Sequence, residues 1–133
     1  MSRSLIQTSN QSSINILANS VIPLGTVTRR FGQNLRLSGN GIEVVGEGYY
    51  TIEGTVSIEP EATGPVTIAI YQDGVQLPSA IAYGYAATAD EPITLPVSGT
   101  TRIGCCDSSS TLTIQLLEGS GVLLNVSARA ERA

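Results

Sequence analysis

The segment that follows Gly48 alternates strictly between apolar and polar residues for the length of a long strand, and this pattern constrains the fold most. Its apolar positions are Tyr50, Ile52, Gly54, Val56 and Ile58. A second alternating segment, Val66–Tyr71, runs into an Asp73-Gly74 turn that is typical of a hairpin. Because side chains two residues apart on a strand share one face, both segments predict antiparallel strands with one buried face.

Similar short runs recur along the chain, separated by turns rich in Gly, Ser, Pro and Asp. They comprise Ile14–Leu24, Leu35–Leu37, Ile42–Val45, Ile81–Tyr85, Pro92–Val97, Thr100–Ile103, Thr111–Leu117 and Val122–Ala128. A total of about eight to ten short strands without a helical pattern predicts an all-β antiparallel sandwich, barrel or jelly roll. The length of 133 residues favours one domain. We expect this domain to span residues 12–133, after a polar, Ser-rich tail over residues 1–11.

The balance of charge argues against nucleic acid as a partner. The net charge is −4, and all seven positive residues are Arg, with Arg29-Arg30 as the only basic pair. Phosphate binding takes clustered Lys and Arg, so we expect this pair to lie in a loop, solvated or paired with acids; an anion site is the alternative. No stretch approaches the about 20 apolar residues of a membrane span, and the first residues lack the apolar core of a secretory signal. Neither a membrane partner nor export is expected.

The residue types on which most enzymes rely are missing. The chain has no His and no Lys, which excludes Ser-His and Cys-His nucleophilic sites, Schiff-base chemistry and most zinc sites. A pair of carboxylates suffices for a glycosidase, but most Asp and Glu residues lie at strand ends or on polar faces, where solvation is expected. Asp90-Glu91 and Glu59-x-Glu61 lack the spacing of a dedicated calcium loop. We therefore expect no enzyme activity, no cofactor and no metal.

The two cysteines, Cys105 and Cys106, are adjacent. Their Cα atoms lie about 3.8 Å apart, below the usual disulfide range, so a bridge between them is not expected. We expect small buried or turn positions. The alternative is that three copies meeting on an axis pool their thiols around a zinc ion.

Tyrosines provide a lead to binding. Tyr83 and Tyr85 are two residues apart and share a strand face, and Tyr71 lies on the preceding strand across the Asp-Gly turn. Such a cluster stacks on sugar rings or anchors a protein interface; the alternative is packing at a sheet edge or subunit seam. The single Phe, Phe31, is expected to close one end of the core.

Several segments together resemble the complement globular-head and tumour-necrosis-factor jelly-roll superfamily. They are Gly48–Val56, Val66–Gly74, Pro92–Leu95, Leu112–Leu116 and Val122–Val126. The same order of a Gly-x-Tyr strand, an Asp/Asn-Gly hairpin and an alternating last strand is similar to the C-terminal domains of BclA-type exosporium collagen-like proteins. Arg29–Gly32 and Leu35–Ile42, together with the cysteine pair, are similar to small structural proteins of Firmicutes phages and prophages.

The resemblance implies a ten-stranded jelly roll that assembles as a trimer around a threefold axis. By position in the superfamily, the trimer interface is expected to include Tyr49, Thr51, Glu53, Leu123 and Asn125. The chain lacks the Gly-x-y repeat of a collagen-like stalk. The acidic loop that holds calcium in some members has no clear counterpart, so the resemblance assigns no metal.

These observations favour a non-enzymatic structural protein, a homotrimeric capsid decoration or head-fibre protein on a phage virion. In this hypothesis the N-terminal tail, through Leu5 and Ile6, docks the trimer onto the major capsid protein or another virion protein. One alternative is a structural module of a bacterial spore or cell surface. Another is a carbohydrate-binding adhesion module that uses Tyr71, Tyr83 and Tyr85 on a host-surface glycan.

Overall fold

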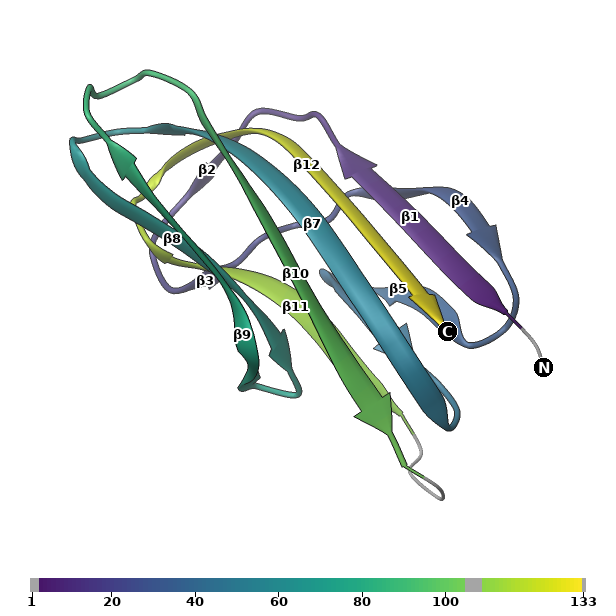
Figure 1. The fold of residues 1–133 in the computed structure, drawn as a ribbon. Helices are drawn as coiled ribbons and strands as arrows, with labels where there is room; N and C mark the ends of the chain where they lie inside the picture. The colour runs from purple at the N-terminus through teal and green to yellow at the C-terminus, as the bar shows by residue number, and fades with distance from the viewer. Residues whose placement is uncertain (1–2, 105–108, 133) are drawn as a thin grey trace.

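A computed structural model describes residues 3–104 and 109–132, which form an antiparallel β-sandwich (Figure 1). Within this part of the chain no helix is present, and hence none that could cross a membrane. The strands are β1 Ser4–Asn10, β2 Ile14–Ile16, β3 Ser20–Val21, β4 Thr26–Phe31, β5 Leu35–Ser38, β6 Gly41–Val44, β7 Gly48–Pro60, β8 Gly64–Gln72, β9 Val75–Ala86, β10 Ile93–Ile103, β11 Ser110–Glu118 and β12 Gly121–Arg132. The predicted all-β class is confirmed. The described residues hold twelve strands instead of eight to ten, two of which, β2 and β3, have only three and two residues.

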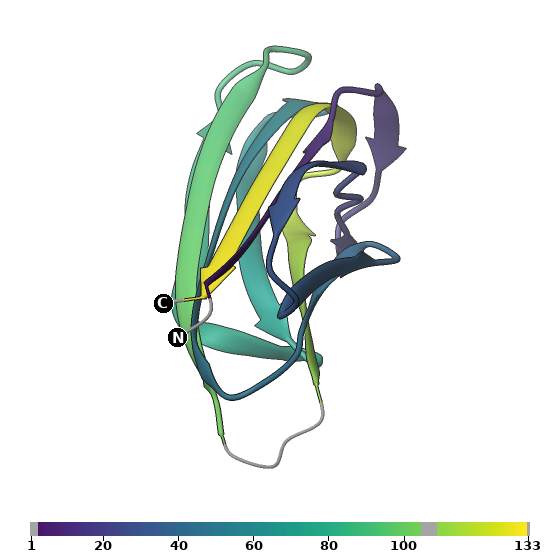
Figure 2. The same cartoon turned by 90° about the vertical axis from the view of Figure 1, so that its right-hand side faces the viewer.

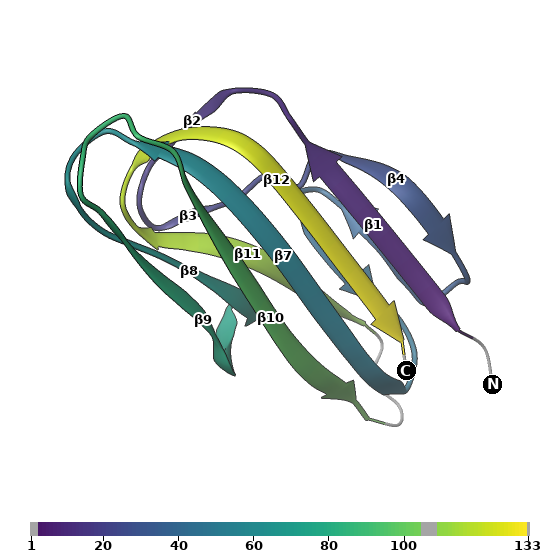
Figure 3. The same cartoon turned by 45° about the horizontal axis from the view of Figure 1, so that its top comes forward.

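The strands form two sheets that pack face to face, visible as separate layers from the side (Figure 2). Sheet A has the order β10-β7-β12-β1-β4, with β2 beside β12. Sheet B has the order β5-β6-β11-β8-β9, with β3 beside β11. Strands far apart in sequence are therefore neighbours in space: β1 lies between β12, the last strand, and β4 (Figure 3).

The core lies between the sheets, and β7 contributes to it as its alternation predicts. Tyr50, Ile52 and Ile58 are fully buried. The Tyr50 hydroxyl reaches the end of the core and lies 2.9 Å from the carbonyl oxygen of Gly46. Gly54 also faces inward, and a Cβ atom there would overlap Cδ1 of Ile114 on the opposite sheet. A residue without a side chain therefore lets the two sheets approach closely at this point.

The predicted tail over residues 1–11 is wrong for residues 4–10, which form β1 inside sheet A. Ile6 is fully buried, so it is not free to dock onto another protein. The other two inward positions of β1 are Ser4 and Thr8, which are also buried. Because polar residues occupy these core positions, the strand lacks the apolar alternation that identifies β7. The domain therefore begins by Ser4 and not at residue 12.

Three further predictions are corrected by strand pairing. Arg29 and Arg30 lie on β4, an edge strand of sheet A, and not in a loop. Phe31 does not close the core but is 55% exposed at the end of that strand. The predicted runs Pro92–Val97 and Thr100–Ile103 are one strand, β10, which continues through Gly99; a Cβ atom at Gly99 would come 2.9 Å from Cβ of Ala80 on β9. This glycine permits the close approach of β10 to β9.

Candidate functional site

The outer face of sheet A, which points away from the core, is the candidate site. Figure 3 looks onto this sheet, and no other described part of the chain lies in front of it. Register and alternation place mostly short, uncharged polar residues on this face: Ser9, Thr51, Thr55, Ser57, Thr94, Ser98, Thr100, Asn125 and Ser127. Ser57 and Thr94 hydroxyls are 2.9 Å apart, and those of Thr51 and Thr100 are 3.4 Å apart. Neighbouring strands thus satisfy some of the polar groups of the face.

One row across this face carries charge. The register aligns Ser98, Glu53, Arg129, Gln7 and Arg29 on β10, β7, β12, β1 and β4 in that order. Arg129 is directly opposite Glu53 but forms its ion pair with Glu131, at 3.2 Å. Within the described residues no hydrogen bond or ion pair of Glu53 is present. The centre of the face therefore holds an exposed carboxylate that lies opposite Arg129 but has no ion pair within the described residues.

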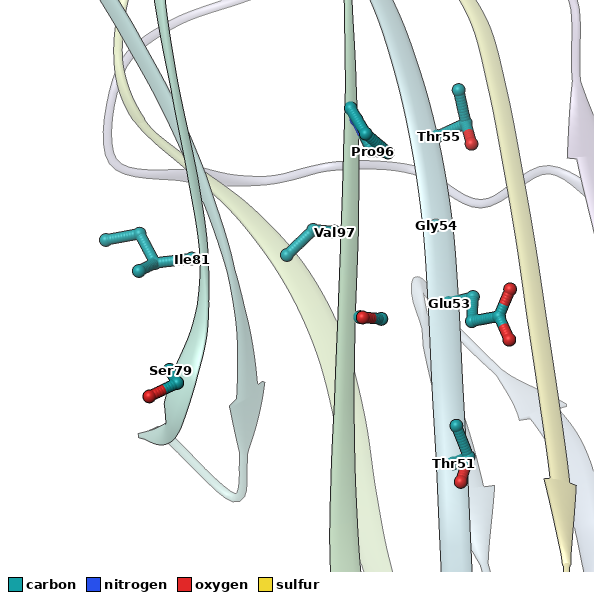
Figure 4. A pocket seen from close by; sticks show the side chains of 9 residues that line it. Thr51, Glu53, Gly54, Thr55, Ser79, Ile81, Pro96 and Val97 are labelled. Atoms are coloured by element: carbon teal, nitrogen blue, oxygen red, sulfur yellow. The ribbon is translucent and has the colours of Figure 1, made fainter.

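Glu53 borders two shallow hollows of the face. The larger, of about 440 Å³, lies between β9, β10 and β7 and is lined by Thr51, Glu53, Thr55, Ile81, Pro96 and Ser98, among others (Figure 4). The second, of about 200 Å³, is lined by Gln7, Glu53, Thr55, Ser127 and Arg129, among others. The hollows form because the Ser and Thr side chains around Glu53 are short and fill little of the space above the backbone.

The structure places four of the five predicted interface residues on this face. Tyr49, Thr51 and Glu53 follow one another on the outer side of β7, and Asn125 on β12 is opposite Ser57. Tyr49 is 57% exposed, and the guanidinium carbon of Arg102 lies 5.9 Å from its ring centroid. Whether these residues meet a second copy stays a prediction.

Leu123, the fifth residue predicted for the interface, does not lie on this face. Leu123 is buried and lies opposite Ile58 in the core. The pairing of β12 with β7 shifts between Leu123 and Asn125, so the two residues lie on opposite faces although they are two positions apart. A bulge of this kind inserts one residue and inverts the alternation beyond it.

The tyrosines lie on the other side of the molecule, on the outer face of sheet B. Tyr83 and Tyr85 on β9 are 74% and 69% exposed and lie opposite Thr67 and Pro65 of β8. Tyr71 is four residues beyond Thr67 on β8, a distance of about 13 Å along a strand. The structure therefore brings Tyr83 and Tyr85 together and leaves Tyr71 apart.

Sequence reasoning missed Gln7, Arg29 and Arg129 as members of the outer face of sheet A. Arg129 alternates with the buried Ala128 and Ala130, a pattern that predicts an outward position. Gln7 and Arg29 carry no such signal, because β1 and β4 lack a clear apolar alternation.

Residues 3–104 and 109–132 contain no group of three or more His, Cys, Asp or Glu side chains that could hold a metal ion. Cys105 and Cys106 lie outside the described residues, so both interpretations of that pair stay predictions.

No known family model and no curated protein matches the sequence. Solved structures do match the fold. Murine APRIL superposes with a TM-score of 0.76 at 11% identity, over 99% of this chain and 100% of the other. The globular domain of zebrafish complement 1qA gives a TM-score of 0.68 at 8% identity, over 94% of each chain. The chain has the jelly-roll fold of these proteins.

A viral protein shares this fold. Vertex protein P5 of phage PRD1 matches with a TM-score of 0.64 at 14% identity, over 97% of this chain and 95% of that one. The predicted likeness to the tumour-necrosis-factor and complement globular-head fold is confirmed. The resemblances to exosporium domains and to Firmicutes phage proteins stay predictions.

Proposed function

We propose that this protein is a non-enzymatic structural module that assembles as a homotrimer through the outer face of sheet A. The observation that carries the proposal is the face itself: an uncovered, five-strand surface of short side chains with shallow hollows. Short Ser and Thr side chains lose little rotamer entropy when buried. Hydroxyl pairs such as Ser57 with Thr94 are already hydrogen-bonded, which lowers the cost of removing water from them.

A threefold ring needs two different patches on each copy, because its contacts are head to tail. The two sides of sheet A supply such a pair. On the β10 side lies the larger hollow beside Glu53. On the β4 side, Phe31 is exposed and lies opposite the half-buried Leu5 on the outer face, so this side offers apolar surface that protrudes. In the proposed ring, the β4 side of one copy packs into the larger hollow of the next copy.

The mass in solution tests this proposal. Light scattering is expected to give about 41 kDa, three times the 13.8 kDa of one chain. Thr55→Arg places a long charged side chain in both hollows and is expected to yield monomers. Thr113→Arg is the matched control, because Thr113 is a half-buried strand threonine on the outer face of sheet B. A wild-type mass of one chain, or a trimer in Thr55→Arg, would contradict the proposed interface.

The more specific proposal is that the trimer decorates a virus particle. Its support is the shared fold with vertex protein P5 of phage PRD1. Attachment through a free tail over residues 1–11 is not part of the proposal, because residues 4–10 belong to sheet A. Mass spectrometry of purified particles is the test: peptides of this chain at a constant ratio to the major capsid protein are expected. Their absence from particles and presence on spores or cell envelopes would overturn it.

The exposure of Tyr83 and Tyr85 favours a second candidate function, in which the module binds a glycan through the outer face of sheet B. Adjacent exposed rings on one strand provide an apolar platform with polar hydroxyl tips. Replacing both tyrosines with Ala is expected to abolish binding on a glycan array. Unchanged binding, or no binding by the wild type, would exclude this candidate.

A further inference from the structure

Glu53 and Arg29 have opposite charges, lie in the same row of the outer face of sheet A, and are both exposed. The Arg29 guanidinium donates one hydrogen bond, of 3.0 Å, to the carbonyl oxygen of the adjacent Thr28. Within the described residues neither side chain has an ion-pair partner. The row therefore contains two complementary charges without an ion pair in the described part of the chain.

Glu53 and Arg29 do not pair with each other in this structure. Glu53 is on β7 and Arg29 is on β4, with β12 and β1 between them. Three strand spacings separate the two backbones by about 14 Å, so a pair would require both side chains to lie extended across β12 and β1, and no such pair is present within the described residues. A contact between Glu53 and Arg29 therefore requires two copies of the chain.

Three other arginines near this face have contacts of their own. Arg129 is paired with Glu131, and Arg30 donates to the carbonyl oxygen of Leu35 at 2.8 Å. The Arg132 guanidinium lies 2.7 Å from the carbonyl oxygen of Glu47, to which it donates. Arg29 is therefore the guanidinium of the β4 side that is available at the level of Glu53.

We propose that Glu53 of each copy forms an ion pair with Arg29 of the neighbouring copy, and that this pair sets the register of the ring. The inference rests on the proposed trimer, in which the β4 side of one copy packs into the hollow that Glu53 borders. The rotation that relates two copies of the ring does not shift a residue along the ring axis. With the ring axis along the strands, residues of one row therefore meet residues of the same row on the next copy.

Charge reversal tests this pair. Glu53→Arg and Arg29→Glu each place like charges at all three contacts of the ring. Each is expected to raise the concentration at which the trimer dissociates by at least about tenfold, because close interfacial charge pairs couple by more than about 1.4 kcal/mol. The double variant Glu53→Arg/Arg29→Glu restores opposite charges and is expected to return to the wild-type dissociation concentration. Sedimentation velocity over a dilution series measures all four proteins.

Glu61→Arg is the matched control for Glu53→Arg, because it makes the same change in net charge at the exposed turn between β7 and β8. It is expected to leave the trimer unchanged. A wild-type trimer that is equally stable in both single variants would overturn the ion pair while leaving the proposed trimer intact. A double variant that stays as weak as the singles would also overturn it, by showing that Glu53 and Arg29 do not contact each other. A monomeric wild type would overturn the trimer itself.

Discussion

The outer faces of sheets A and B enclose the same core but differ in the size of their side chains. On sheet A, Ser and Thr residues surround one row of charges, and its large exposed side chains, Tyr49 and Phe31, lie near one end. On sheet B, Tyr83 and Tyr85 protrude from the edge strand β9. A surface of short side chains can approach another backbone closely over a broad area. Protruding rings instead favour a local contact with a small ligand or a partner's pocket.

The largest expected effect concerns β1, on which the face of sheet A depends. Ile6→Ala is expected to lower the free energy of unfolding by about 2–5 kcal/mol, because it removes a fully buried side chain from the core. Gln7→Ala, at the exposed neighbouring position, is expected to change it by less than about 0.5 kcal/mol. Urea denaturation of both variants measures this difference. Equal, small effects would mean that β1 is not part of the folded sheet.

A smaller loss of stability is expected when a methyl group is added on the core-facing side of sheet A. Gly54→Ala is expected to destabilise the fold by about 1–3 kcal/mol, because the added Cβ overlaps Cδ1 of Ile114. Ile114→Val removes that atom. Thermal denaturation is expected to show that the double variant loses less than the sum of the two single losses. Strict additivity would show that the sheets do not touch at Gly54.

The smallest expected effect comes from the outer face of sheet B. Replacing Tyr83 and Tyr85 with Ala is expected to change the free energy of unfolding by less than about 0.5 kcal/mol per substitution, because both rings are mostly in solvent. The trimer mass is also expected to stay unchanged, in contrast to Thr55→Arg on sheet A. Dissociation of the trimer in the tyrosine variant would assign the Tyr83 and Tyr85 side chains to the assembly contact and contradict this difference between the two faces.

Prediction from sequence succeeded where apolar alternation is unbroken and failed where polar residues or a bulge interrupt it. On β7, the inward and outward residues follow the pattern without exception from Tyr49 to Ile58. On β1, Ser4 and Thr8 occupy core positions and concealed the strand. On β12, the shift between Leu123 and Asn125 moved Leu123 from the outer face to the core. Neither a buried hydroxyl nor a bulge has a reliable local signature, because both depend on strands that pair from far along the chain.

The sequence by itself determined the all-β class and the buried face of β7, because both follow from local alternation with a period of two. It also excluded the catalytic chemistry that requires His or Lys. Only the tertiary structure decided which residues share the candidate site. Ser98, Glu53, Arg129, Gln7 and Arg29 come from five separate strands and form one row through long-range hydrogen-bonded pairing. Local pattern sets which way a side chain points, whereas the order of the strands in the sheet sets its neighbours.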